Sequence, residues 1–222
     1  MTRPPEFICI GAQKAGTTWL YEQLRRHPQI HIPAKEMNVF LRDLPLDAFA
    51  DAGADQIVGD ISPVYGAAPG IAAKIARACP SAKLVMLIRN PVERAWSQYR
   101  MAVRLGNIPR EVSFLDAFLD DRQWLQRRGR YAEIIGEFSS VAGPLLVLDF
   151  ARIAREPRRL LADIYAFLGL DPVIDDACAA AVFAPSRQSE PIPADAADRV
   201  AAYYQPLNER LHEILPWRPG WL

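Results

Sequence analysis

The chain has 222 residues, half of them hydrophobic and 23% charged, which is an ordinary composition for a globular protein. Its 26 lysine and arginine residues are balanced by 26 aspartate and glutamate residues, and this zero formal net charge argues against a general nucleic-acid or membrane-surface binder. The length predicts a single domain over residues 1–222, in which any anion is held by a local site.

Strand and helix patterns alternate along the chain. In chain order we expect a strand at 7–10, a helix at 17–26, an irregular segment at 29–54, a strand at 57–60, a helix at 69–79, a strand at 83–88, a helix at 91–105, two helices between 113 and 140, a strand at 144–150, and helices at 157–168 and 194–215. Buried strands separated by helices predict an α/β fold of three layers, with a central parallel sheet flanked by helices. Ligands of such sheets bind at the carboxyl ends of the strands, so functional residues are expected in the loops after Ile10, Asp60, Ile88 and Phe150.

The first expected strand runs into the loop GAQKAGTTW, residues 11–19. Its two glycines keep the spacing of the nucleotide-binding P-loop, but Thr17 stands where that loop has its lysine, and the lysine lies inside the loop as Lys14. Backbone N–H groups of the loop, the amino end of the next helix and the hydroxyls of Thr17 and Thr18 suit an anion. The loop therefore predicts a phosphate-type site whose lysine reaches a leaving-group oxygen.

A second anion site is predicted within LVMLIRNPVERAWSQY, residues 84–99. Arg89 ends a buried strand, and Ser97 lies about two turns into the helix that starts at Pro91. An arginine fork and a hydroxyl together suit a terminal phosphate dianion. Two separate anion sites indicate a ligand with two phosphate groups.

QKAGTTWL resembles the phosphosulfate loop of the sulfotransferases that use 3′-phosphoadenosine 5′-phosphosulfate (PAPS), and RNPVERAWSQY resembles their 3′-phosphate site. More weakly, KEMNVF at 35–40, GDISPVY at 59–65 and the segments 129–138 and 146–170 resemble regions of carbohydrate-type and heparan-sulfate-type members. The chain is thus similar to a bacterial enzyme of this family. The resemblance implies a P-loop-like fold and transfer of a sulfuryl group from PAPS to a hydroxyl of a small-molecule or carbohydrate acceptor, without a metal.

The resemblance also implies roles for individual residues. The donor site would comprise Lys14, Ala15, Gly16, Thr17, Thr18, Trp19, Arg89, Ser97 and, in the loop at 184–191, Arg187. Lys14 would contact the oxygen that bridges phosphate and sulfate. Glu36 is the expected general base for the acceptor hydroxyl, with His31 as the alternative. Ile61 stands where some relatives carry a catalytic lysine, and Asp149-Phe150 stands where an E-D pair is frequent.

Two other functions remain open at this point. A P-loop kinase-like phosphotransferase would use the glycine spacing, with Asp149 at a strand end to hold Mg²⁺, but it has no place for an Arg89 and Ser97 site. A nucleotide-binding relative without turnover is the other alternative, and the retained Lys14, Arg89, Ser97 and Glu36 argue against it.

The remaining expectations concern the cellular setting. The cysteines Cys9, Cys79 and Cys178 are far apart and lack metal-ligand spacing, which predicts free buried thiols in a reducing compartment. No apolar segment approaches the ~20 residues of a membrane span. We therefore expect a cytoplasmic monomer or homodimer with no membrane or nucleic-acid partner.

Overall fold

The computed structural model describes residues 3–175 and 190–222, so Cys178 and Arg187 lie outside the described residues. Five strands form one parallel sheet in the order β2-β3-β1-β4-β5. The strands are β1 (Phe7–Gly11), β2 (Ile30–His31), β3 (Ile57–Ile61), β4 (Lys83–Ile88) and β5 (Leu145–Asp149). The expected parallel sheet is confirmed, and β2, which has only two residues, is the strand that the sequence pattern did not predict.

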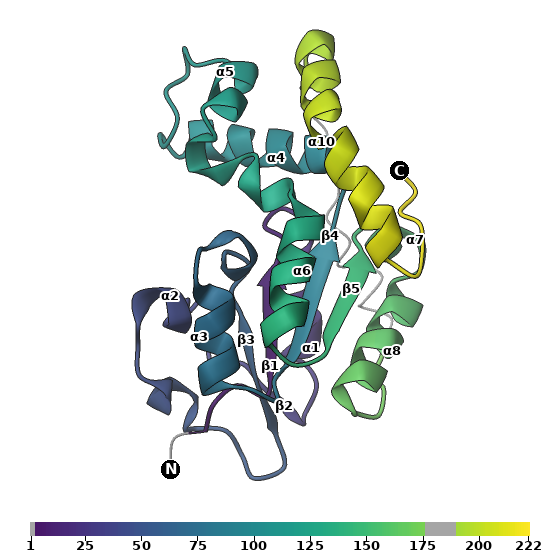
Figure 1. Cartoon of the computed structure of the whole chain (residues 1–222). Helices are drawn as coiled ribbons and strands as arrows, with labels where there is room; N and C mark the ends of the chain where they lie inside the picture. The colour runs from purple at the N-terminus through teal and green to yellow at the C-terminus, as the bar shows by residue number, and fades with distance from the viewer. Residues whose placement is uncertain (1–2, 176–189) are drawn as a thin grey trace.

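Helices cover both faces of the sheet. The four helices involved are α1 (Thr17–Leu24), α3 (Ile71–Ala78), α6 (Tyr131–Val141) and α8 (Pro157–Leu168). In Figure 1, α3 and α6 lie in front of the sheet and α1 lies behind it. The His27 ring, just after α1, lies 4.8 Å from the Tyr165 ring of α8, so α8 packs beside α1. The three-layer prediction is therefore confirmed.

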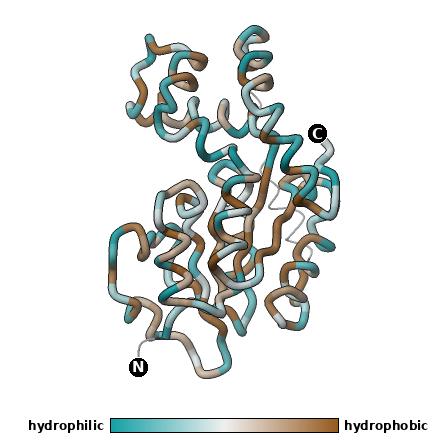
Figure 2. Tube along the Cα trace, in the orientation of Figure 1, coloured by the Kyte–Doolittle hydropathy of each residue, from teal (hydrophilic) through white to brown (hydrophobic). Residues whose placement is uncertain are grey.

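Burial explains why these segments form strands. All five residues of β1 are buried, and so are the last five residues of β4, because helices exclude water from both faces. Figure 2 shows that these strands are the most hydrophobic part of the chain trace. The irregular segment expected at 29–54 contains, besides β2, only α2 (Val39–Arg42) and the 3₁₀ turn η1 (Leu46–Phe49).

A second, smaller hydrophobic core lies beyond the carboxyl edge of the sheet. It is formed by α4 (Pro91–Arg104), α5 (Phe114–Leu119) and α10 (Ala194–Ile214), which Figure 1 shows above the sheet. Helix α4 begins where the sequence predicts, because the Asn90 side chain accepts from the backbone N–H groups of Val92 and Glu93 at 2.9 and 3.4 Å.

The remaining elements are short. They are the 3₁₀ turns η2 (Tyr65–Ala67), η3 (Arg122–Trp124) and η4 (Arg127–Gly129) and the helix α7 (Arg152–Arg155). The turn η2 follows the carboxyl end of β3, and α4 follows the carboxyl end of β4. Loops from β1, β3, β4 and β5 thus meet at one edge of the sheet, as expected for a ligand site.

Candidate active site

The glycine loop after β1 has the conformation of an anion cradle. Gly16 precedes α1 with φ +90°, and a Cβ atom there would lie 2.4 Å from Ile153 Cδ1, so only glycine fits. Lys14 also has a left-handed backbone, with φ +68°. Within the described part of the chain, no backbone carbonyl accepts from the N–H groups of Lys14, Gly16, Thr17 or Thr18. These donors, at the amino end of a helix, are suited to phosphate or sulfate oxygens.

The Lys14 ammonium lies among other positive charges. Its Nζ atom is 3.6 Å from the Met101 sulfur of α4, which is a weak acceptor. Burial lowers the pKa of Lys14, and the nearby charges of Arg104, Arg89 and Lys35 lower it further. No carboxylate among the described residues forms an ion pair with Lys14. An anionic ligand in the loop would relieve this repulsion.

Arg89 lies at the boundary between the glycine loop and α4. Its guanidinium donates to one Glu93 carboxylate oxygen at 2.9 and 3.1 Å and lies 4.8 Å from the centre of the Phe150 ring. It also approaches the Lys14 carbonyl oxygen at 3.5 Å. Ser97 is half-buried and follows Glu93 by one turn of α4, so it lies on the same face. The structure thus places Arg89 and Ser97 along one side of α4, next to the loop.

The same face of α4 carries two site residues that the sequence analysis missed. Met101 follows Ser97 by four residues, and Arg104 completes the stripe. Met101 contacts Lys14, and the charge of Arg104 lowers the pKa of Lys14. Helical spacing from Ser97 was the signal that would have found both residues.

Glu36 lies in a backbone segment held against the end of β3. Its N–H donates to the Ile61 carbonyl at 2.8 Å, and its φ of +60° is in the left-handed region. Its carboxylate is ion-paired with Lys35 and is 43% exposed. Glu36 also raises the pKa of Lys14, which brings the expected base and the expected leaving-group cation within electrostatic reach of each other.

A buried carboxylate organises the segment that carries Glu36. Asp60 is fully buried and accepts from the hydroxyls of Ser62 and Tyr65 at 2.6 and 2.7 Å. Those hydroxyls accept from the backbone N–H groups of Asn38 and Phe40 at 3.0 and 3.2 Å. Burial raises the pKa of Asp60, and the two hydroxyl donors oppose that rise. The GDISPVY motif therefore holds the neighbouring KEMNVF segment in place, a role that its sequence alone did not indicate.

Other expected site residues have different settings. His31 is half-buried at the end of β2, and its buried Nε2 atom has no partner in the part of the chain that the structure describes. Trp19 is 1% exposed and packs in the main core. Ala15 is fully buried, whereas Thr18 is exposed. Asp149 is 8% exposed and accepts from the Ala151 N–H at 2.9 Å, which stabilises the turn after β5.

The described residues contain no cluster of three or more histidine, cysteine, aspartate or glutamate residues able to hold a metal ion. None of their helices has the length and apolar character needed to cross a membrane.

Comparison with known proteins fits this geometry. Residues 70–176 match the model of the "Sulfotransferase family", a range that contains Arg89 and Ser97. A crystal structure of a sulfotransferase from Alicyclobacillus acidocaldarius superimposes with a TM-score of 0.81 and 26% identity, covering 96% of both chains. The chain is therefore similar to sulfotransferases in the matched range and, in fold, along nearly its whole length. The phosphate loop precedes the matched range. Its assignment therefore depends on the geometry of the loop and on the superposition of the whole chain.

Curated sulfotransferases are also similar to the chain. Heparan sulfate glucosamine 3-O-sulfotransferase 3B1 from Mus musculus is 28% identical over 186 residues, which cover 78% of the chain and 48% of that protein. Membrane-associated sulfotransferase kil1 from Dictyostelium discoideum is 33% identical over 124 residues, covering 50% of the chain and 26% of that protein. The chain therefore spans about half of the first relative and about a quarter of the second.

Proposed function

We propose that the chain transfers the sulfuryl group of PAPS to a hydroxyl of a small-molecule or carbohydrate acceptor and releases 3′-phosphoadenosine 5′-phosphate (PAP). The observation that carries this proposal is the pair of cationic sites at one edge of the sheet. One is the glycine loop with Lys14, and the other is Arg89 with Ser97 on α4. A donor with a phosphosulfate and a separate 3′-phosphate matches both sites.

The site residues fit separate roles in the reaction. The acceptor oxygen forms a bond to sulfur while the bond from sulfur to the bridging oxygen breaks. We assign Lys14 and the loop N–H groups to the negative charge that develops on the departing phosphate. Glu36 takes the proton of the acceptor hydroxyl, and His31 is the alternative base. Thr17 and Thr18 supply hydroxyl donors beside the loop.

The kinase-like alternative has less support. Thr17 replaces the P-loop lysine, and the Asp149 carboxylate already accepts from a backbone N–H. We also propose that the protein acts as a single domain over residues 1–222 in the cytoplasm. The two cysteines inside the described ranges, Cys9 and Cys79, are free and buried, which suits a reducing compartment.

The test is the affinity for three nucleotides, read from thermal stabilisation and titration calorimetry. PAP should bind clearly more tightly than 5′-AMP, because only PAP occupies both anion sites. Arg89→Ala should remove this preference and leave 5′-AMP binding unchanged, whereas Arg25→Ala, an exposed control at the end of α1, should change neither. Equal affinities of the parent protein for PAP and 5′-AMP, or tighter binding of ATP with Mg²⁺, would contradict the proposal.

A further inference from the structure

Beside the candidate active site lie a fully buried arginine, Arg94, and a half-buried one, Arg128, and neither forms an ion pair with a described residue. Arg94 is fully buried; it donates to Gln98 Oε1 at 2.5 Å and to the Leu125 carbonyl, and its Nε has no partner among the described residues. The buried Nε atom of Arg128 also lacks a partner in the described ranges, and the guanidinium lies 5.3 Å from the centre of the Trp124 ring. Buried charges are normally paired, because an unpaired ion is costly to remove from water.

The two guanidinium groups affect each other. Burial lowers the pKa of Arg128 to about 10, and the positive charge of Arg94 contributes to the lowering, while Asp121 and Glu36 act in the opposite direction. Two like charges thus share a poorly solvated region. Glu36, the expected base, is close enough for its charge to affect Arg128.

The fold places Arg128 at the same edge of the sheet as the glycine loop. The turn η4 that carries Arg128 contacts both α4 and η2, which follow β4 and β3. Because β1 lies between those two strands, η4 is positioned over the end of the sheet where the glycine loop starts. Arg94 precedes Met101 by seven residues and shares its side of α4, and Met101 contacts Lys14.

The stretch that carries Arg128 is held firmly. The Tyr204 hydroxyl of α10 donates to the carbonyls of Leu125 and Gln126 at 3.1 and 2.9 Å. A Cβ atom at Gly129 would lie 2.5 Å from that hydroxyl, so glycine is needed for this contact. The preceding residues Asp121, Gln123 and Trp124 have left-handed backbones. Strained conformations of this kind persist where the surroundings fix them, and they cluster at functional sites.

We propose that Arg128, with Arg94 behind it, binds an anionic group of the acceptor, so that the enzyme selects acceptors bearing a carboxylate, sulfate or phosphate near the reacting hydroxyl. This inference rests on the proposed sulfuryl transfer and adds a third anion site to the two assigned to the donor. The anion would supply the charge that Arg94 and Arg128 lack among the described residues. It would also fix the acceptor next to Glu36.

The experiment uses acceptor pairs that differ in charge. The first pair is 4-hydroxybenzoate and its methyl ester, and the second is methyl β-D-glucuronide and methyl β-D-glucoside. The parent protein should turn over the anionic member with a kcat/KM higher by about tenfold or more, because a hydrogen bond to a charged group is worth that factor. Arg128→Gln should bring the ratio close to one, and Arg128→Lys should retain part of it.

Arg127→Gln is the matched control. Arg127 is the neighbouring residue, is exposed, and lies 5.8 Å from the same Trp124 ring, so its replacement should leave the charge preference intact. Arg128→Gln removes one of two like charges and should not lower the melting temperature. A clear loss of thermal stability in Arg128→Gln would indicate a structural role and contradict the proposal.

Further outcomes decide between the two proposals. If the parent protein binds no PAP, the proposed function itself fails. If PAP binds and the parent shows no charge preference, or Arg128→Gln keeps it, the acceptor site is overturned. If Arg128→Gln weakens PAP binding instead, Arg128 belongs to the donor site. If neither pair is turned over, the affinity of the PAP-saturated protein for methyl β-D-glucuronide is measured instead. Equal affinities of the parent and Arg128→Gln would overturn the proposal.

Discussion

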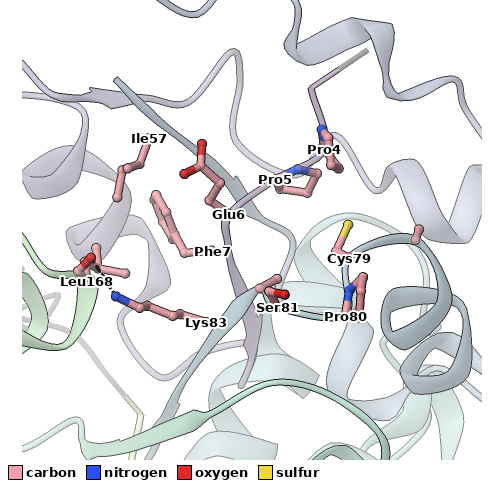
Figure 3. Close-up of a pocket in the computed structure, with 12 residues that line it drawn as sticks. Pro4, Pro5, Glu6, Phe7, Ile57, Cys79, Pro80, Ser81, Lys83 and Leu168 are labelled. Atoms are coloured by element: carbon pink, nitrogen blue, oxygen red, sulfur yellow. Dashed lines mark hydrogen bonds between the residues drawn. The ribbon is translucent and has the colours of Figure 1, made fainter. Parts of the chain in front are cut away.

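Both edges of the sheet have a lysine beside a buried strand, but the two ammonium groups have different surroundings. At the amino edge, Lys83 Nζ donates to the Leu168 carbonyl at 2.8 Å, at the end of α8. Figure 3 shows this bond within a cavity of about 340 Å³ that is also lined by Phe7, Cys79 and Pro80. At the carboxyl edge, Lys14 contacts a thioether sulfur and lies among other cations.

The difference separates a structural cation from a functional one. Lys83 donates to a carbonyl in the last turn of a helix, where the helix itself supplies no donor. The Lys83 ammonium therefore stabilises the fold. Among residues 3–175 and 190–222 no carbonyl accepts from Lys14 Nζ, and burial and like charges make its ammonium form less favourable. The cavity at the amino edge therefore does not mark the candidate active site, whose cationic residues lie at the carboxyl edge. The following changes test this contrast.

The largest effect is expected for Glu36→Gln at the carboxyl edge. The substitution keeps the size of the side chain and removes its basicity, so kcat for an aliphatic hydroxyl should fall by about 10²–10⁴ with PAP affinity preserved. His31→Asn, made in parallel, should be mild. The opposite result would make His31 the base. Full activity of both variants on a phenol would indicate an acceptor acidic enough to need no base.

Lys14→Ala should follow, with kcat lowered about 10²–10³-fold, which corresponds to about 2.7–4 kcal/mol of lost transition-state stabilisation. PAP affinity should fall much less. The pKa of Lys14 is lowered in the free protein, so the parent should lose kcat/KM for PAPS with rising pH below the ordinary lysine value, as the ammonium deprotonates. Lys14→Arg should remove this alkaline limb. Normal turnover with only a raised KM for PAPS would make Lys14 a simple binding residue.

Ser62→Ala should have a smaller effect on turnover. It removes the hydroxyl that accepts from Asn38 N–H, two residues from Glu36, so the base is held less firmly. We expect roughly a tenfold loss of kcat for weakly acidic hydroxyls, a smaller loss for acidic phenols, and unchanged PAP binding. Ser140→Ala, which removes a surface hydroxyl bonded to the Glu137 carbonyl, serves as the control. An equal loss for all acceptors would argue for a general structural defect.

Lys83→Met should have the smallest effect on turnover. The free energy of unfolding should decrease by about 1–3 kcal/mol, because the Leu168 carbonyl loses its donor, while kcat stays within about twofold. Chemical denaturation and steady-state kinetics on the same preparation measure both quantities. A large loss of kcat would erase the contrast between the two edges.

Local sequence patterns predicted the main strands and helices well. The apolar run at 83–88 became β4, and Asn90 and Pro91 started α4 as their cap and first-turn preferences require. The position of Lys14 and Arg89 at the carboxyl edge follows from the order of strands and loops. The sequence could predict the positions of these two residues because each lies within a few positions of a strand end.

The residues that the sequence did not reveal depend on contacts between distant segments. Asp60 acts on the Glu36 segment through Ser62 and Tyr65, and that relation exists only because Lys35 pairs with the end of β3. The turn that carries Arg128 is held because the Tyr204 hydroxyl bonds the carbonyls of Leu125 and Gln126, which precede it in sequence by 79 and 78 residues. Neither contact has a local periodicity that a sequence pattern could show.

Helix α4 belongs to both halves of the molecule. Ala95 and Ala102 pack in the second core, the opposite face carries Ser97 and Met101 beside the glycine loop, and Arg94 lies on the flank between them. A change in the packing of α5 or α10 would therefore reach Ser97 and Met101, because one helix carries both sets of contacts.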